Sequence, residues 1–187
     1  MCDVARLTGL STEHASPMKL QGTITINGRT YTKGTEVGWL RIYPFFLVHM
    51  FAFGMSGFAM AYGAKRPDEL FLYAHGGFAI AIYIAFYFTI FGIDEVKWMF
   101  INAALGIAGI YSQVDWIVKR FGKEIADVPW HVNVIPFMYY VLYVFLIRQA
   151  FLDLFAARED SARRASVEKV YVAVSLVICG IFWLLDR

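Results

Sequence analysis

Residues 70–92 read LFLYAHGGFAIAIYIAFYFTIFG, and this stretch decides the class of the fold. It contains no Asp, Glu, Lys or Arg, and it is longer than the ~20 residues that a helix needs to cross the hydrocarbon core of a bilayer. A surface helix of a soluble protein keeps a polar face, and this stretch has none. It therefore predicts a transmembrane helix.

The rest of the chain repeats this pattern around short, charged connections. Apolar stretches of similar length lie at residues 43–63, 97–118, 130–152 and 169–185. Of 187 residues, 59% are hydrophobic and only 17% are charged, against about a quarter in a soluble domain. Because short connections make neighbouring spans antiparallel, we expect an all-α integral membrane protein, a five-span up-down bundle formed by residues 41–187.

Residues 1–40 form a predicted extramembrane segment with a short β-hairpin at residues 22–33. An Asn-Gly pair lies at its centre, and a two-residue type I′ turn prefers that pair. Pairing across the turn sets Ile24 opposite Tyr31, and alternation places Ile26 on the same face. An isolated hairpin is marginal in water, so this face should pack on the end of the membrane domain, on a second copy or on a partner subunit.

The tryptophans follow the aromatic belts of membrane proteins. Trp39 and Trp98 fall at one predicted interface, and Trp116, Trp130 and Trp183 fall at the other. A small excess of Lys and Arg on the N-terminal side, and the lack of a secretory-signal pattern, favour a cytoplasmic N-terminus for a multi-pass protein of an inner or plasma membrane. A net charge of +2 sets nucleic acid aside, so the expected partners are the lipid bilayer and other membrane subunits or further copies.

Small and polar residues at helical spacing suggest how the spans pack. In the third span the face Asn102, Gly106, Gly109 and Gln113 predicts that this helix is the centre of the bundle. In the fourth span Pro136 predicts a kink. The charge-rich residues after this span, up to Lys169, are expected to continue the fourth helix out of the membrane before the chain turns.

Five ionisable residues inside or beside the predicted spans are the candidate site residues, because a charged group costs roughly 2.5–3.5 kcal/mol or more at the bilayer centre. Depth divides them into two groups. His49 and Arg148 lie toward the N-terminal side, whereas His75, Asp115 and His131 lie toward the opposite side.

The second group is the predicted cofactor site. His75 and His131 differ in depth by about one helical turn, which suits the two axial ligands of a b-type haem, with Asp115 orienting one of them. The same groups would also suit a metal ion or a proton relay, and the structural alternative is an Asp115–Lys119 pair beside a solvated His131. On the other side, His49 would bind a quinone or a lipid head group and Arg148 would reach a lipid phosphate.

Function is predicted from this architecture, since the chain carries no metalloprotease, hydrolase, phosphate-loop or Cys-x-x-Cys motif. We expect a membrane subunit within or beside a larger membrane complex, one linked to electron transfer or quinone. One alternative is a small oligomeric transporter or channel, with the face from Asn102 to Gln113 lining a path. The other is a redox protein that holds b-type haem between His75 and His131.

Overall fold

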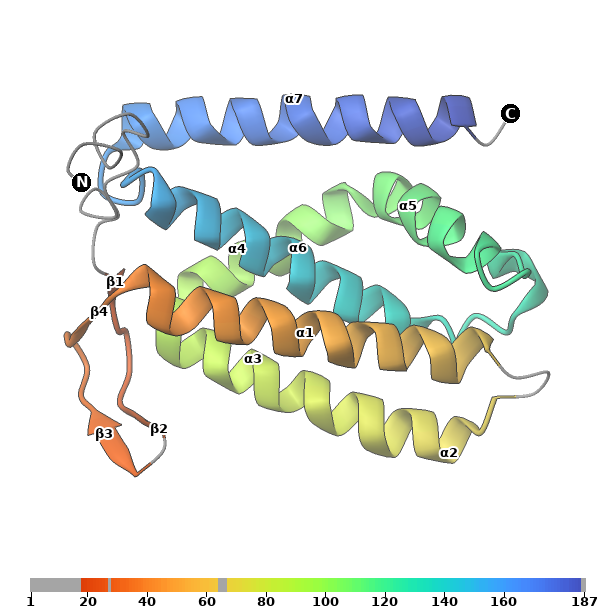
Figure 1. Cartoon of the computed structure of the whole chain (residues 1–187), viewed down its shortest axis with the longest axis horizontal. Coiled ribbons are helices and arrows are strands. Elements are labelled where there is room, and N and C mark those ends of the chain that lie inside the picture. Colours follow the sequence, from red (N-terminus) through yellow and green to blue (C-terminus); the bar gives the residue numbers. More distant parts are fainter. Residues whose placement is uncertain (1–17, 27, 64–66, 186–187) are drawn as a thin grey trace, which may run out of the picture.

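The computed structural model describes residues 18–26, 28–63 and 67–185, without the side chains of five of these residues. Those side chains are Ile26, Cys179, Phe182, Trp183 and Leu185. The described chain is mostly helical, with strands near its N-terminus, and its long helices run in alternating directions along one axis (Figure 1). The helices are α1 (Trp39–Tyr62), α2 (Glu69–Phe71), α3 (Phe78–Phe91), α4 (Ile93–Leu105), α5 (Ile107–Lys119), α6 (Val134–Leu154) and α7 (Ser161–Leu185).

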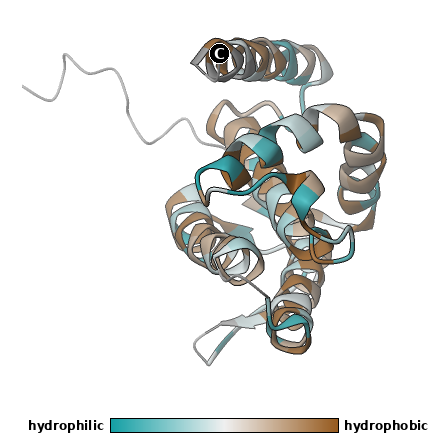
Figure 2. Ribbon diagram, turned by 90° about the vertical axis from the view of Figure 1, so that its right-hand side faces the viewer, coloured by the Kyte–Doolittle hydropathy of each residue, from teal (hydrophilic) through white to brown (hydrophobic). Residues whose placement is uncertain are grey.

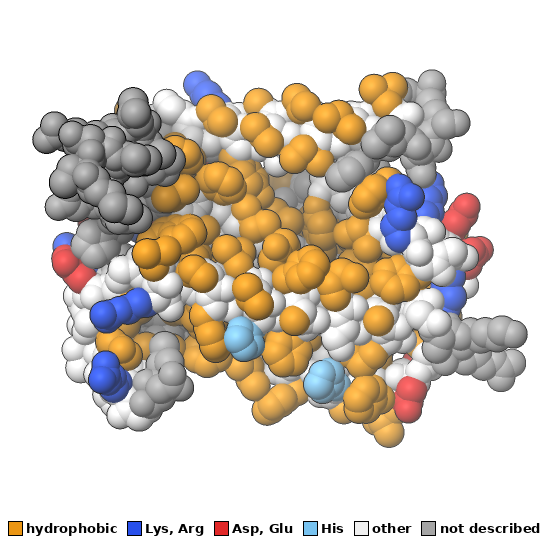
Figure 3. All heavy atoms as spheres, in the orientation of Figure 1, with side chains coloured by type: hydrophobic (Ala, Val, Ile, Leu, Met, Phe, Trp, Pro, Cys, Tyr) orange, Lys and Arg blue, Asp and Glu red, His pale blue; other side chains and the backbone are white. Residues whose placement is uncertain are grey.

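Three of the described helices are long and apolar enough to cross a membrane. They are α1, α6 and the continuous helix Glu69–Phe91, which joins α2 and α3 through the π turn η2 (Leu72–Gly77). This confirms the first, second and fourth predicted helices and is compatible with a membrane location. Hydrophobic side chains also cover the middle of the face in Figure 3, whereas charged side chains gather toward the two ends.

The other two predicted spans coincide with α4 plus α5 and with α7. Gly106 separates α4 from α5, and the two short helices together run from one end of the bundle to the other (Figure 1). At the start of this passage Gly92 has φ +90°, and the chain needs this single residue to reverse from α3 into α4. Figure 2 looks along the bundle and shows α7 standing apart from the other helices.

The centre of the bundle is α6, so the prediction of a central third span is wrong. Tyr139 and Leu142 of α6 are fully buried, and α1 approaches so closely that a Cβ on Gly57 would meet the Tyr139 ring at 2.8 Å. By contrast, Asn102 is exposed, and a Cβ on Gly109 would meet nothing within 4 Å. The close contacts are therefore made by large side chains of α6, Tyr139 and Ile135, against Gly57 and Gly76 rather than by the small-residue face of the third span.

Pro136 does not kink the fourth helix in mid-span as predicted. Residues 130–133 form turns, and α6 begins only at Val134. Pro136 therefore lies in the first turn, where backbone N–H groups have no partner within the helix in any case. At its other end α6 stops at Leu154 and α7 begins at Ser161, so the charge-rich residues do not extend the fourth helix as expected.

The hairpin has the predicted register. Strands β2 (Ile24–Ile26) and β3 (Arg29–Tyr31) pair Ile24 with Tyr31. Gly28 has φ +74°, as the turn requires, and Asn27 lies outside the described residues. A second pair of strands, β1 (Met18–Lys19) and β4 (Glu36–Val37), closes the base of this segment.

Of the three expected packing partners, the hairpin segment uses its own helical domain. Met18, Leu20 and Ile24 are buried in the same core as the helices. The backbone N–H groups of Gln21 and Gly22 both donate to the Thr89 carbonyl near the end of α3, at 3.0 and 2.8 Å. Because Ile24 of this face is buried and Tyr31 is half-buried against the helical domain, the hairpin does not by itself indicate a partner subunit.

Candidate functional site

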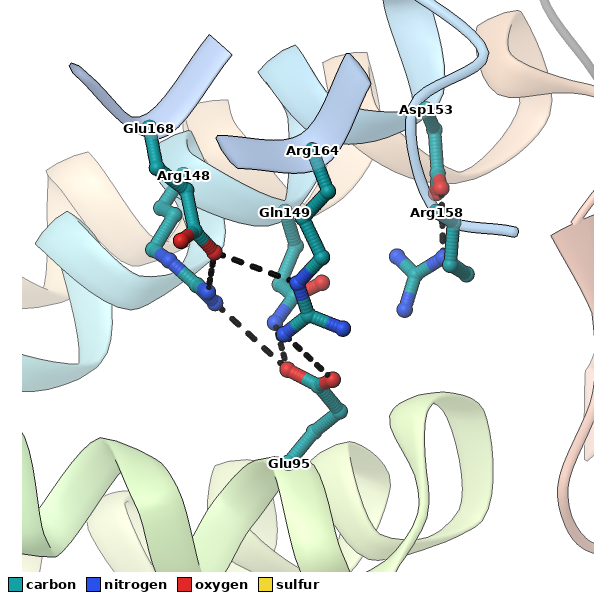
Figure 4. A network of polar contacts seen from close by, with 7 residues as sticks. All are labelled: Glu95, Arg148, Gln149, Asp153, Arg158, Arg164 and Glu168. Carbon is teal, nitrogen blue, oxygen red and sulfur yellow. Dashed lines mark hydrogen bonds and ion pairs between the residues drawn. The ribbon is translucent and has the colours of Figure 1, made fainter. Parts of the chain in front are cut away.

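Five side chains form an ion-pair cluster that joins α4, α6 and α7 at the strand end of the bundle (Figure 4). Glu95, in the first turn of α4, accepts hydrogen bonds from Gln149 Nε2 and Arg164 Nη2, both at 2.9 Å. Arg148 Nη1 lies 3.4 Å from Glu95 Oε2, and Arg148 also contacts Glu168. Arg164 Nε completes the ring at 3.1 Å from Glu168 Oε1. We call these five residues the Glu95 cluster, in which two acids balance two arginines.

The contacts within the Glu95 cluster favour the charged forms of Glu95 and Arg164. Burial alone would raise the pKa of Glu95, but the hydrogen bond from Gln149 and the charges of Arg164 and Arg148 outweigh it, and the pKa lies below its ordinary value. For the cation Arg164, burial alone would lower the pKa. Its contacts with Glu168 and Glu95 outweigh this effect, and the pKa lies above its ordinary value. These half-buried ion pairs link α4, α6 and α7 only while both partners of each pair are present.

A second buried carboxylate lies close to this cluster. Asp153 of α6 is only 3% exposed, and it accepts hydrogen bonds from Tyr43 Oη of α1 and, at 2.6 Å, from Arg158 Nε of the α6–α7 connection. The Arg158 guanidinium also lies over the Phe91 ring, 5.6 Å from its centroid. Burial lowers the pKa of Arg158, but its contacts with Asp153 raise it by more. Asp153 thus links α1, α6 and the α6–α7 connection.

The structure does not bring the first predicted group together. Arg148 is held by two carboxylates in the Glu95 cluster. His49 lies exposed on α1, with Nδ1 2.9 Å from the Phe45 carbonyl of its own helix and its ring against the Phe45 ring. Among the described contacts the two side chains share no neighbour, and their binding of quinone or lipid stays a prediction.

His75 lies in the π turn η2 and faces outward. Its ring stacks on Phe71, with centroids 5.5 Å apart and planes inclined by 4°, and lies 6.1 Å from the Phe53 ring of α1. π turns of this kind occur frequently at functional sites. His75 is therefore placed by aromatic neighbours rather than by a polar partner within the described residues.

His131 lies in the turn before α6 and contacts the start of the second helix. Its Nε2 is 3.1 Å from Glu69 Oε2, an ion-pair distance without the alignment of a hydrogen bond. Tyr73 Oη donates to the His131 carbonyl. His131 and His75 therefore have different neighbours, and haem binding between them stays a prediction.

Asp115 has the contact that the structural alternative predicted. Its Oδ2 lies 3.4 Å from Lys119 Nζ, one turn further along α5. Its Oδ1 accepts a hydrogen bond from the Ile125 backbone N–H at 3.2 Å, at the start of the 3₁₀ turn η3 (Ile125–Asp127). Within the described part of the chain, no group of three His, Cys, Asp or Glu side chains is arranged to hold a metal ion.

Asn133, which the sequence did not single out, completes this end of the bundle. It is 7% exposed, and its Oδ1 accepts from Tyr62 Oη at 2.7 Å. Its Nδ2 donates to the carbonyls of Ile125 and Val128 at 3.4 and 3.5 Å. Together with Asp115, it fixes the 125–129 loop across the end of the bundle.

A cavity of about 810 Å³ lies between α5, this loop and the start of α6. A smaller, polar pocket of about 460 Å³ adjoins it, and Asp127 lines both. The walls of the larger cavity are mostly apolar or aromatic and include Tyr111, Ile125, Val128, Trp130, Val134, Phe137 and Met138. The smaller pocket is lined by Lys119, Gly122, Lys123, Glu124 and Asp127. Both are open to the surface, so the pair offers an apolar groove with a charged mouth.

Comparison with known protein families, with curated proteins and with solved structures gives no match.

Proposed function

We propose that the chain is a five-span membrane subunit that assembles with another membrane-spanning chain through α7. The third span would be residues 97–118, formed by α4 and α5 and bent at Gly106, and the fifth would be residues 169–185 of α7. Three helices with the required length and hydropathy support this placement, as does the passage of α4 and α5 from one end of the bundle to the other (Figure 1). The greater number of Lys and Arg residues at the strand end favours a cytoplasmic N-terminus.

The observation that carries the proposal is the uneven attachment of α7. Its first half is fixed to the bundle, because Arg164 and Glu168 belong to the Glu95 cluster and Tyr171 Oη donates to the Val144 carbonyl at 3.5 Å. Its second half has exposed apolar side chains pointing in several directions. Among the described residues these are Val174, Leu176, Val177, Ile178, Ile181 and Leu184.

A membrane helix packs by close contact between backbones and by polar pairs, since burial from lipid adds no hydrophobic gain. In α7, Ala173 and Gly180 are exposed and seven residues apart, so they fall on the same face. A Cβ on Gly180 would meet nothing within 4 Å. A neighbouring transmembrane helix can therefore approach this face closely, while the Glu95 cluster keeps α7 in position.

The mass of the complex in mild detergent tests this proposal. We expect the wild type to elute with a second membrane chain, and Gly180→Phe to release it because the ring fills the face that the partner approaches. Gly109→Phe is the matched control, since Gly109 on α5 also has open space around it. A wild type with the mass of a single chain, or equal behaviour of the two variants, would contradict the proposal. A complex of identical copies would instead favour the oligomeric transporter or channel.

The b-type haem reading is the second candidate function, and the position of His75 in a π turn favours it. A haem held by His75 and His131 would give the purified protein a Soret band, and His75→Ala would remove that band. His49→Ala, on the outer face of α1, should leave it unchanged. Absence of the band from wild-type protein purified from haem-supplied cells would exclude this candidate.

A further inference from the structure

The cavity between α5 and α6 changes character along the bundle axis. Its mouth is the 125–129 loop, at the end of the bundle, and the chamber reaches one to two turns along α6 to Phe137 and Met138. Tyr111 lines it from α5, and Trp130 lies at the mouth with 79% of its surface exposed. A lipid has an apolar chain below a polar head group. The apolar interior of the cavity would suit the chain, and the aromatic rim would lie at the level of the head group.

The walls of this cavity are fixed by polar contacts. Asp115 holds the Ile125 N–H, and Asn133 holds the carbonyls of Ile125 and Val128. Tyr62 in turn donates to Asn133 from α1. The loop therefore forms a preformed wall, so a ligand would enter without having to order it first.

The charged pocket at the mouth contains both signs. Lys119 and Lys123 supply two cations, and Glu124 and Asp127 supply two anions. Glu124 and Asp127 also accept from each other's backbone N–H groups in a capping box, which keeps both carboxylates in this pocket. Lys119 also faces Asp115 Oδ2 at 3.4 Å, so these side chains together carry no net positive charge, and the pocket complements a head group that has one positive and one negative charge.

We propose that this cavity and its charged mouth bind one zwitterionic phospholipid of the phosphatidylethanolamine type. An acyl chain would fill the apolar chamber, Lys119 and Lys123 would bind the phosphate, and Glu124 and Asp127 would accept from the ammonium group. The inference rests on the membrane placement proposed above. The ammonium N–H donors distinguish this lipid from phosphatidylcholine, which has none, and the balanced charge distinguishes it from anionic phosphatidylglycerol.

Quenching of Trp130 fluorescence tests the inference. The full chain is reconstituted in nanodiscs of phosphatidylcholine that contain small fractions of a lipid with brominated acyl chains and an ethanolamine, choline or glycerol head. The difference between wild type and Trp130→Phe isolates the signal of Trp130. We expect half-maximal quenching by the ethanolamine lipid at a mole fraction about two- to fivefold lower than for the other two, the effect of one or two exposed ion pairs.

Two variants test the role of the head group. Lys123→Gln should remove the preference for the ethanolamine lipid, whereas Lys97→Gln should keep it, because Lys97 is an exposed lysine at the opposite end of the bundle, paired only with Asp94 within the described residues. Unfolding temperatures of both variants establish that they are folded.

Three results would overturn the inference. Equal quenching by all three lipids would mean that bulk lipid fills the cavity without selection, and a preference for the glycerol lipid would mean an anion site. Displacement of every brominated lipid by a short-chain quinone, independent of the head group, would mean a quinone site. None of these results depends on the partner of α7, so this inference and the proposed function fail separately.

Discussion

The two ends of the bundle use buried polar residues in opposite ways. At the strand end, the Glu95 cluster and Asp153 pair each charge with another charge, and the pocket that Arg148 lines there has a volume of about 200 Å³. At the loop end, the neutral side chains Tyr62 and Asn133 carry the buried contacts, and a cavity of about 810 Å³ remains beside them. The charge pairs at the strand end join helices to one another, whereas the neutral contacts at the loop end fix the wall of the cavity. The predictions below test this contrast.

Asp153→Ala should have the largest effect. It leaves the buried guanidinium of Arg158 without its carboxylate and removes the acceptor of Tyr43, which costs about 3–5 kcal/mol of unfolding free energy. Asp94→Ala is the control, because the Asp94 side chain is 87% exposed and pairs only at the surface with Lys97. Reversible unfolding in detergent measures both. Similar losses of unfolding free energy in the two variants would mean that the buried charge pair does not stabilise the strand end.

Asn133→Ala should have an intermediate effect at the loop end. Removing the acceptor of Tyr62 and the donor to the Ile125 carbonyl costs about 1–3 kcal/mol. The 125–128 backbone should also exchange its amide hydrogens faster, which mass spectrometry measures. Asn102→Ala, an exposed asparagine on α4, serves as the comparison. Unchanged exchange in Asn133→Ala would show that this side chain does not hold the cavity wall.

Glu95→Gln should cost less, about 0.5–1 kcal/mol at neutral pH for a partly exposed ion pair, and it should change the response to acid. The pKa of folded Glu95 lies below its ordinary value of 4.5, so its contribution to stability is complete above that value. The contribution is lost as the pH falls through the lowered value. The unfolding temperature of the wild type should therefore fall more steeply below pH 4.5 than that of Glu95→Gln. Parallel curves would contradict the role of Glu95.

Lys119→Ala should have the smallest effect on stability. Lys119 pairs with Asp115 one turn earlier on α5, and such surface pairs contribute about 0.3–0.5 kcal/mol. Asp115 keeps its bond to the Ile125 N–H in this variant. Calorimetric unfolding should therefore detect almost no change. A loss above about 1 kcal/mol would mean that the loop end also depends on charge pairs.

The sequence predicts local features of this fold well. The apolar stretch at residues 70–92 is a helix, and Asn-Gly predicts the pairing of Ile24 with Tyr31, because both depend on residues close in the chain. The prediction that the third span is the central helix was wrong for a physical reason. Small residues at helical spacing on α4 and α5 show that a close approach is allowed, but they do not show which helix makes it.

The Glu95 cluster was missed for a similar reason. Its residues come from three helices, and no local spacing brings Glu95 to Arg164. A signal was nevertheless present, because Glu95 begins the third span, Arg148 ends the fourth and Glu168 precedes the fifth. All three lie at the same depth on the same side, and Arg148 carries the opposite charge to the two glutamates. Depth in the membrane, which divides the histidines into two groups, therefore also places these three residues together.

Photo-crosslinking from α7 in intact membranes tests the central claim most directly. A photoreactive residue is placed at Val177, which is 62% exposed on α7, and for comparison at Val48, which is 66% exposed on α1. If α7 docks on another membrane-spanning chain, Val177 forms a discrete protein adduct and Val48 labels only lipid. If both positions label only lipid, α7 faces the bilayer alone and the chain is not a subunit joined through this helix.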